Sequence, residues 1–214
     1  MLSFRERAGD VIRRSLFYGI VFRVKNFRDY RSWMRSPKTS APPHVVKQHL
    51  VREAARERNL RTLVETGTYL GEMVFAMRDY FDVIYSVELD AELYSRAKRR
   101  FSSLNHLQLL RGDSSVVLPE ILRKLDNRAL FWLDGHYSGG LTAMGNQTTP
   151  IAEELSCICR HRVRGHIVLI DDARCFNGTC GYPTLDQIKE LVLGTGFAES
   201  VVVQDDIIRI VGGN

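Results

Sequence analysis

Five short apolar runs, separated by helical segments, constrain the fold of this chain more than any other feature of its sequence. The longest apolar stretches of these runs, residues 129–133 and 167–170, are continuous, as in strands that are buried on both faces of a parallel sheet. The segments between them have the length and the apolar spacing of helices. A chain that alternates strand and helix in this way forms a layered α/β domain. The runs are residues 61–66, 83–88, 106–110, 129–134 and 166–172.

The end of the chain breaks this alternation. Residues 198–203 and 206–211 read as two further strands, and the two residues between them are too few for a crossover connection. These strands must therefore pair antiparallel. We predict a doubly wound α/β domain with a mostly parallel seven-stranded sheet and a C-terminal antiparallel hairpin. We place this domain at residues 44–214, after an N-terminal helical arm over residues 1–36 and a linker over residues 37–43.

The positive charge of the chain is concentrated in the arm. The formal net charge is +5, whereas residues 1–40 alone carry ten Lys and Arg against three Asp and Glu. The remaining residues therefore have a net charge of −2, which argues against a nucleic-acid partner. Only the arm suits an anionic surface. The four cysteines include no C-x-x-C pair, so nothing suggests a zinc site.

The arm has apolar residues at helical spacing with arginines around them. Its uncharged run, residues 15–22, is shorter than the about 20 residues that are needed to span a bilayer. Three surfaces could cover the stripe: the chain's own domain, a second copy in a homodimer, or the headgroup region of a membrane. An apolar helical stripe more often meets protein than lipid, so we favour the first two. We expect a cytoplasmic protein, peripherally membrane-associated in the third case. The residues of the stripe are Leu16, Ile20, Val24, Phe27, Tyr30 and Met34.

A glycine turn follows the first strand, and acids follow the strands after it. In the turn, Gly67 and Gly71 let the backbone bend tightly and approach a ligand, and a helix begins at Glu72. Open α/β sheets bind ligands at this C-terminal edge of their strands. Any single acid here could instead be a helix cap or a turn residue. The acids are Glu65, Glu88, Asp113, Asp134, Asp171 and Asp172.

Residues 44–211 resemble the Rossmann-like (class I) S-adenosylmethionine-dependent methyltransferases, whose sheet ends in such a reversed hairpin. The first motif of that family, acid-x-Gly-x-x-x-Gly, falls on the turn and implies that it cradles the methionine part of the cofactor. The ribose-binding acid of the family falls on Glu88, and the adenine-contacting acid on Asp113. Nicotinamide dinucleotide enzymes use G-x-G-x-x-G instead, and Tyr69 stands where their second glycine would be. The implied cofactor-binding residues are Glu65, Thr66, Gly67, Thr68, Tyr69, Gly71, Glu88, Asp113, Ser114 and Asp134.

Within this class, the sequence looks most like the metal-dependent small-molecule O-methyltransferases of the catechol and macrolide-sugar branches. Those enzymes take one metal-binding acid from the end of the fourth strand and an adjacent pair from the end of the fifth. The matching residues are Asp134 and the pair Asp171 and Asp172. Three carboxylates suit a hard divalent ion such as Mg²⁺. The resemblance implies that the metal makes an acceptor hydroxyl more acidic, so that its oxygen attacks the sulfonium methyl group.

The candidate base for the acceptor proton lies just past the fourth strand. His136 follows Asp134 by two residues, and a histidine works as a base near neutral pH. The catechol branch places a lysine near this point, whereas this chain has none between Lys124 and Lys189. Stacking on the cofactor or supporting a neighbouring residue is the alternative role of His136. The catalytic candidates are His136, Tyr137 and Asp134, and the loops at residues 139–146 and 174–182 are expected to wall the acceptor site.

The sequence thus predicts a methyltransferase that uses S-adenosylmethionine and a divalent metal to methylate a small hydroxylated acceptor, such as a sugar or a secondary metabolite. Two alternatives stay open. One is a metal-independent methyltransferase with a different acceptor, and the other is a non-catalytic cofactor-binding or scaffold protein. A nucleic-acid methyltransferase is disfavoured because the chain has no Asn/Asp-Pro-Pro-aromatic motif of the kind that base-modifying enzymes carry.

Overall fold

The structure is a computed structural model, and it describes residues 13, 17–38, 41–135 and 149–213. The chain divides into two compact units, residues 1–47 and 48–214, which are described one at a time. Helix α3 (His44–Glu57) begins in the first unit and continues into the second.

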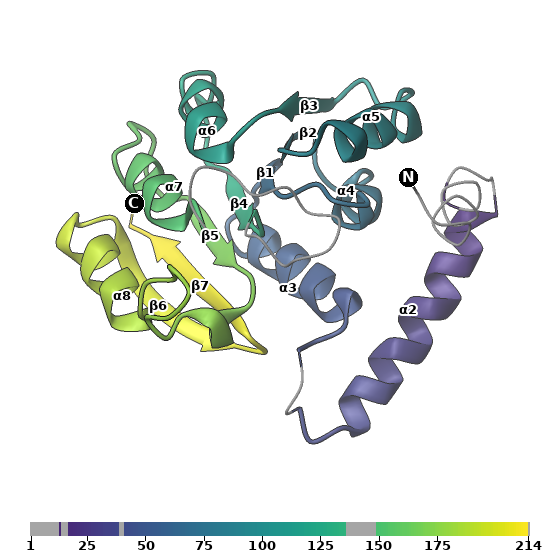
Figure 1. Ribbon diagram of the computed structural model, residues 1–214, viewed down its shortest axis with the longest axis horizontal. Helices are drawn as coiled ribbons and strands as arrows, with labels where there is room; N and C mark the ends of the chain where they lie inside the picture. The colour runs from purple at the N-terminus through teal and green to yellow at the C-terminus, as the bar shows by residue number, and fades with distance from the viewer. Residues whose placement is uncertain (1–12, 14–16, 39–40, 136–148, 214) are drawn as a thin grey trace. The chain divides into compact units, whose positions relative to one another are not determined.

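A seven-stranded sheet forms the centre of the second unit (Figure 1). Its strand order is β3-β2-β1-β4-β5-β7-β6, and all neighbours pair parallel except β5 with β7 and β6 with β7. This confirms the predicted sheet and its closing hairpin. The chain runs outward from β1 to β3 and then returns to place β4 beside β1, so the strand order reverses between β1 and β4. The strands are β1 (Thr62–Thr66), β2 (Val83–Glu88), β3 (Leu107–Arg111), β4 (Leu130–Leu133), β5 (Ile167–Ile170), β6 (Ala198–Gln204) and β7 (Ile207–Gly212).

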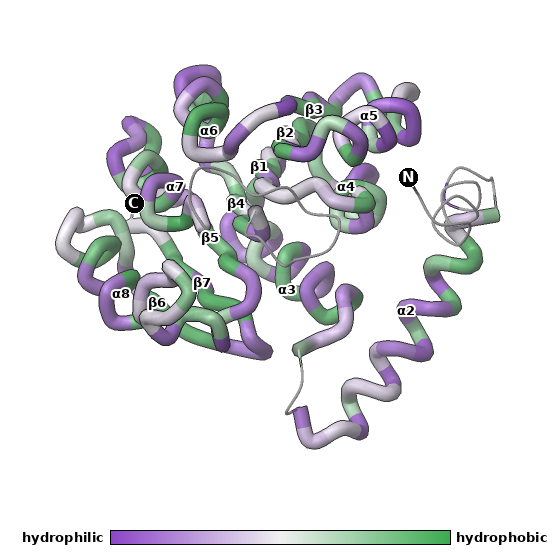
Figure 2. The backbone as a smooth tube through the Cα atoms, viewed as in Figure 1, coloured by the Kyte–Doolittle hydropathy of each residue, from purple (hydrophilic) through white to green (hydrophobic). Residues whose placement is uncertain are grey.

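Helices cover both faces of the sheet, which explains why β4 and β5 are apolar throughout. In β4, Phe131 and Leu133 belong to the core shared with α6, α7 and α8, whereas Leu130 and Trp132 belong to the core shared with α3 and α4. Successive strand residues point to opposite faces, so a strand covered on both sides needs an apolar residue at every position. Figure 2 shows the hydrophobic residues gathered along these strands. The helices are α4 (Glu72–Met77), α5 (Ala91–Arg100), α6 (Ser114–Leu122), α7 (Ile151–Cys159) and α8 (Leu185–Gly194).

The first unit contains helix α2 (Tyr18–Arg35). Its buried residues are Tyr18, Phe22 and Trp33, which the predicted apolar stripe does not include. The stripe residues Val24 and Phe27 are exposed. The helix therefore forms where the sequence predicts it, but it buries a different face. None of the described helices is long and apolar enough to cross a membrane.

Two buried histidines join the N-terminal ends of β4 and β5. The Ala129 amide donates to His166 Nδ1 at 3.0 Å, which leaves the ring proton of His166 on Nε2. His166 Nε2 lies 2.9 Å from His161 Nδ1, and His161 Nε2 lies 2.9 Å from the carbonyl oxygen of Leu122. Both rings are thus fixed as neutral tautomers. Burial, together with the neighbouring His161, lowers the pKa of His166 to about 4.

We predict that the contribution of His166 to stability is lost at acidic pH. Its folded-state pKa lies below the ordinary value of 6.5, so its contribution is complete above pH 6.5 and falls as the unfolded chain takes up a proton. The loss should be at most about 1.4 kcal/mol per pH unit. Urea unfolding of the wild type and of His166→Gln from pH 7.5 to 4.5 should show the difference between them shrinking with acidity. The exposed His49→Gln is the control, and a difference that stays constant with pH would contradict the prediction.

Candidate functional site

The glycine turn after β1 is closed against both neighbouring strands. The amides of Gly67 and Thr68 donate to the Val87 carbonyl of β2 at 3.0 and 3.1 Å. On the other side, Gly67 has a φ of +87°, and a β-carbon added there would lie 2.3 Å from the carbonyl oxygen of Asp134. A side chain at position 67 would therefore push the turn away from the end of β4. The turn sits where the strand order reverses, which is the usual ligand site of such sheets.

Glu65 is buried at the end of β1, in register with Ser86 of β2. The Ser86 hydroxyl donates to Glu65 Oε2, and the Thr68 hydroxyl lies 2.6 Å from Ser86 Oγ. When Glu65 is ionised, the one proton of Ser86 goes to the carboxylate, so Thr68 then donates to Ser86. Burial raises the pKa of Glu65 to about 8; the Ser86 hydrogen bond opposes this shift, and the charges of Asp134 and Glu88 add to it. Without a cation nearby, Glu65 is therefore mostly protonated at pH 7.

Glu88, the predicted ribose acid, is tied to the same turn. The amides of Tyr69 and Asp90 donate to its two carboxylate oxygens at 2.7 and 2.9 Å. Burial raises the pKa of Glu88, and these amides act in the opposite direction. The Leu89 amide also hydrogen-bonds this carboxylate. Because its two oxygens have about four lone pairs between them, the carboxylate retains capacity for one more donor such as a hydroxyl group.

Asp113 and Ser114, the predicted adenine-contacting residues, begin α6. Asp113 caps this helix, since its Oδ1 accepts from the Ser115 amide at 2.9 Å and from the Ser115 hydroxyl at 2.7 Å. The helix-cap alternative thus accounts for one of its two oxygens, and contact with adenine stays a prediction.

Two hydroxyl groups converge beside Gly135, next to the end of β4. A β-carbon added at Gly135 would lie 3.2 Å from Thr66 Oγ1 and 3.5 Å from Ser114 Oγ. Thr66 Oγ1 is buried and has no hydrogen-bond partner among the described residues. A buried hydroxyl without a partner is uncommon, and a bound ligand is one of the ways to satisfy it. Thr66 and Ser114 therefore fit the polar part of a ligand placed over the turn.

The predicted metal ligands follow β4 and β5 but do not form a metal site. In the part of the chain that the structure describes, no three His, Cys, Asp or Glu side chains are grouped to hold a metal ion. Asp171 is buried, and its Oδ1 accepts the Asp172 amide at 2.9 Å. Asp172 has a φ of +55°, and its carboxylate pairs with Arg174 Nη1 at 2.9 Å. A guanidinium group thus faces the carboxylate that was assigned to a divalent ion, and the three acids do not fit the predicted metal.

Arg174 also fixes the segment after β5 to the closing hairpin. Its backbone amide donates to Asp206 Oδ1 at 2.8 Å, and its guanidinium group pairs with the other oxygen of Asp206. The Ala173 amide donates to the Asp206 carbonyl oxygen at 2.8 Å. These contacts hold the short 3₁₀ helix η1 (Ala173–Cys175) against the turn between β6 and β7.

Tyr182 brings a phenol toward the acidic strand ends. Burial raises its pKa, and the charges of Cys175, Asp172 and Asp134 raise it further. Its ring packs edge-on against Phe176, with centroids 5.4 Å apart. Tyr182 thus stays protonated and can donate a hydrogen bond. The expected role of residues 174–182 as a wall of the acceptor site stays a prediction.

Sequence reasoning missed two contacts at the candidate site. Some of the residues that it predicted for the site lie outside the part of the chain that the structure describes. It missed Ser86, although a lone hydroxyl inside an otherwise apolar run is a usable signal. It also missed the pairing of Asp172 with Arg174, which no spacing rule indicates. His136, Tyr137 and residues 139–146 lie outside the described residues.

Solved structures of several methyltransferases have a fold similar to that of this chain. No family model and no curated protein matches the sequence. The O-methyltransferase TomG of Streptomyces achromogenes, solved with S-adenosylmethionine, is 15% identical with a TM-score of 0.60, and the match covers 89% of each chain. An O-methyltransferase of Bacillus cereus, solved with S-adenosylhomocysteine, is 10% identical with a TM-score of 0.59, over 88% of this chain and 89% of that one.

The N-methyltransferase NodS of Bradyrhizobium japonicum, also solved with S-adenosylhomocysteine, is 11% identical with a TM-score of 0.54. The match covers 88% of this chain and 99% of NodS. Enzymes that methylate oxygen and nitrogen thus share the architecture, so the fold does not determine the acceptor atom. The chain has the α/β fold of S-adenosylmethionine-dependent methyltransferases.

Proposed function

We propose that this chain is an S-adenosylmethionine-dependent methyltransferase that acts on a hydroxyl group of a small acceptor, such as a sugar or a secondary metabolite. The observation that carries the proposal is the junction of the glycine turn with two buried acids, Glu65 and Glu88. Their carboxyl groups lie at the reversal of strand order, where ligands bind in such sheets. A cationic ligand with ribose hydroxyls complements these two acids.

The chain's own residues would divide the cofactor between them. Glu65, in its network with Ser86 and Thr68, faces the methionine part and favours a bound cation once it is ionised. Glu88 uses its remaining lone pairs to accept from the ribose hydroxyls. Thr66 and Ser114 supply hydroxyl groups beside Gly135. The bound cofactor supplies an activated methyl group on a sulfonium centre.

Methyl transfer to oxygen also requires removal of the acceptor proton. We assign this step to His136, with Tyr137 as the neighbouring alternative, because histidine is the side chain that most often acts as a general base near neutral pH. Asp134 contributes negative charge at the same strand end, and it is one of the charges that raise the pKa of Tyr182. The main task of the protein is to position the acceptor oxygen in line with the methyl group.

We further propose that transfer proceeds without a bound metal ion. The ion pair of Asp172 with Arg174 supports this reading, because a guanidinium group already holds one of the carboxylates that would bind a divalent ion. The metal-assisted mechanism of the catechol and macrolide-sugar branches, with Mg²⁺ on Asp134, Asp171 and Asp172, is the alternative. A non-catalytic cofactor-binding or scaffold role is the alternative from another class.

Calorimetry should show that the full chain binds S-adenosylhomocysteine at a single site. Glu88→Gln should weaken binding roughly tenfold, because it removes the charge from the hydrogen bonds to ribose. The matched control is Glu92→Gln, which changes an exposed glutamate four residues away. Absence of binding to the folded protein would refute the cofactor, and unchanged affinity in Glu88→Gln would remove this acid from the site.

The affinity for S-adenosylhomocysteine should rise with pH between about 6 and 8. The ammonium group of S-adenosylhomocysteine favours ionised Glu65, whose pKa of about 8 means that binding must release a proton below that pH. The expected slope is at most about tenfold per pH unit. Glu65→Gln cannot titrate and should have a flatter profile, whereas Glu92→Gln should follow the wild type. A wild-type slope that survives in Glu65→Gln would contradict this role.

Turnover should be measured as release of S-adenosylhomocysteine across a panel of small hydroxylated acceptors. We expect the rate to be unchanged by EDTA and to fall roughly 100-fold in His136→Asn, with cofactor affinity preserved. His49→Asn, on α3, is the control. Activity that EDTA abolishes and Mg²⁺ restores would favour the metal-assisted alternative. Cofactor binding without turnover on any acceptor would favour the non-catalytic alternative.

A further inference from the structure

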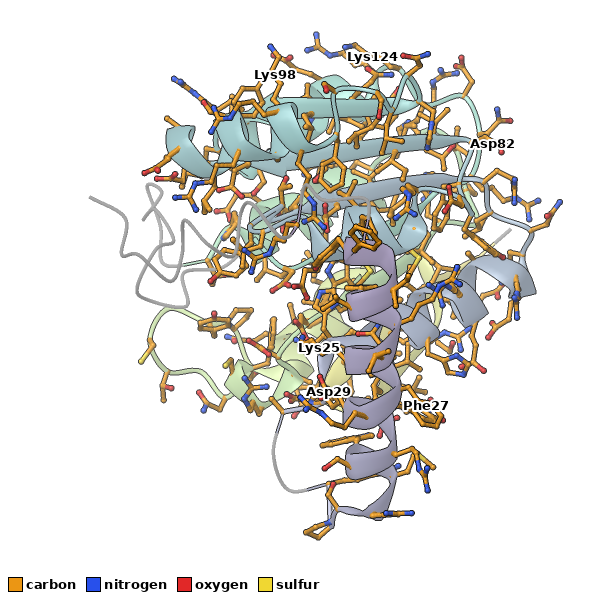
Figure 3. The ribbon with its side chains drawn as sticks, turned by 90° about the vertical axis from the view of Figure 1, so that its right-hand side faces the viewer. Lys25, Phe27, Asp29, Asp82, Lys98 and Lys124 are labelled. Carbon is orange, nitrogen blue, oxygen red and sulfur yellow. The ribbon has the colours of Figure 1, made fainter. Side chains whose placement is uncertain are left out.

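Helix α2 has one buried and one exposed apolar face among its described residues. Tyr18, Phe22 and Trp33 are between 6% and 7% exposed, whereas Val24 and Phe27 are each 64% exposed. Figure 3 shows Phe27 projecting from the opposite side of α2 to Lys25 and Asp29. The large exposed apolar residues at this helix are Phe17, Ile20, Val21, Val24, Phe27, Tyr30 and Met34.

The exposed side becomes basic toward the C-terminal end of the helix. At about 100° per residue, Arg28, Arg31 and Arg35 lie on the same side as Val24. The guanidinium carbon of Arg31 lies 5.5 Å from the centroid of the Phe27 ring, which joins the apolar part to the basic part. We call this combined surface the docking face; it consists of Phe17, Ile20, Val21, Val24, Phe27, Met34, Arg28, Arg31 and Arg35.

The basic part of the docking face borders a hollow of about 600 Å³. Three guanidinium groups and the Ser32 hydroxyl are hydrogen-bond donors at this space, whereas the Ser36 hydroxyl donates to the Trp33 carbonyl oxygen at 2.8 Å. Guanidinium groups bind phosphate oxygens through paired, charge-assisted hydrogen bonds. The hollow therefore suits a phosphate group. Its lining residues are Phe27, Arg28, Arg31, Ser32, Arg35 and Ser36.

We propose that α2 lies on an anionic membrane surface through its docking face. The apolar residues would enter the boundary between headgroups and acyl chains, and the hollow would hold lipid phosphates. A lipid surface offers an apolar region and phosphate groups together, and for this reason we propose it as the partner of the docking face. A second copy is disfavoured because α2 carries five Lys and Arg against one Asp, so two such faces repel each other. The inference is independent of the methyltransferase proposal.

Co-sedimentation of the full chain with vesicles tests the proposal. Vesicles with about 30 mol% phosphatidylglycerol should bind the chain, pure phosphatidylcholine vesicles should bind it at least tenfold more weakly, and about 0.5 M salt should weaken the binding. Val24→Glu/Phe27→Glu should abolish binding, because it places two charges in the apolar part. Arg28→Glu/Arg31→Glu should weaken binding at least 25-fold, since each basic residue near such a surface is worth roughly fivefold.

A matched control changes the net charge of the chain by the same amount as the arginine variant. Lys98→Glu/Lys124→Glu changes two exposed lysines of the second unit, labelled in Figure 3, and should bind as the wild type does. Circular dichroism should show that all variants retain the wild-type fold. Equal binding to neutral and anionic vesicles, or equal loss in the lysine control, would overturn the proposal. So would a dimer in sedimentation equilibrium that Val24→Glu/Phe27→Glu dissociates, because the docking face would then cover a second copy.

Discussion

The rest of the candidate site depends on one close backbone contact, the packing of Gly67 between β2 and β4. The Val87 carbonyl accepts from the turn on one side, and the Asp134 carbonyl lies where a side chain at position 67 would be on the other. Because no room exists for a β-carbon, the turn, the end of β2 and the end of β4 form one rigid junction. The glycine is thus required by the protein's own packing, before any ligand is considered.

That junction crowds carboxyl groups into a poorly solvated edge. The charges of Asp134 and Glu88 both disfavour ionisation of Glu65, in addition to its burial. A cluster of this kind is unfavourable in the free protein unless protons or cations neutralise it. The same arrangement favours a cationic ligand, so the electrostatic cost in the free protein is the source of selectivity in the proposed complex.

The fold could be predicted from the sequence because the strands are buried on both faces and the connection between the last two strands is too short for a crossover. It also placed Glu65 and Glu88 correctly at the sheet edge, because strand ends follow from strand limits. It was insufficient for contacts between distant side chains. The sequence predicts Asp172 as a metal ligand because it does not show that the fold places Arg174 beside it. Helical spacing predicted that α2 buries the face with Val24, but α2 buries the face with Tyr18. A helix with two apolar faces does not specify which of them is covered.

The two edges of the sheet respond to pH in opposite directions. At the N-terminal edge, neutral His166 loses its contribution as pH falls below 6.5; at the C-terminal edge, protonated Glu65 loses its contribution as pH rises from its ordinary value toward 8. Between pH 4.5 and 6.5 a rise in pH increases the contribution of His166 to stability and decreases that of Glu65. Above pH 6.5 only the decrease at Glu65 continues. A bound cation would stabilise ionised Glu65 and remove that loss. The proposed cofactor should therefore stabilise the fold most at the upper end of the pH range, where the free protein is weakened by its own binding site.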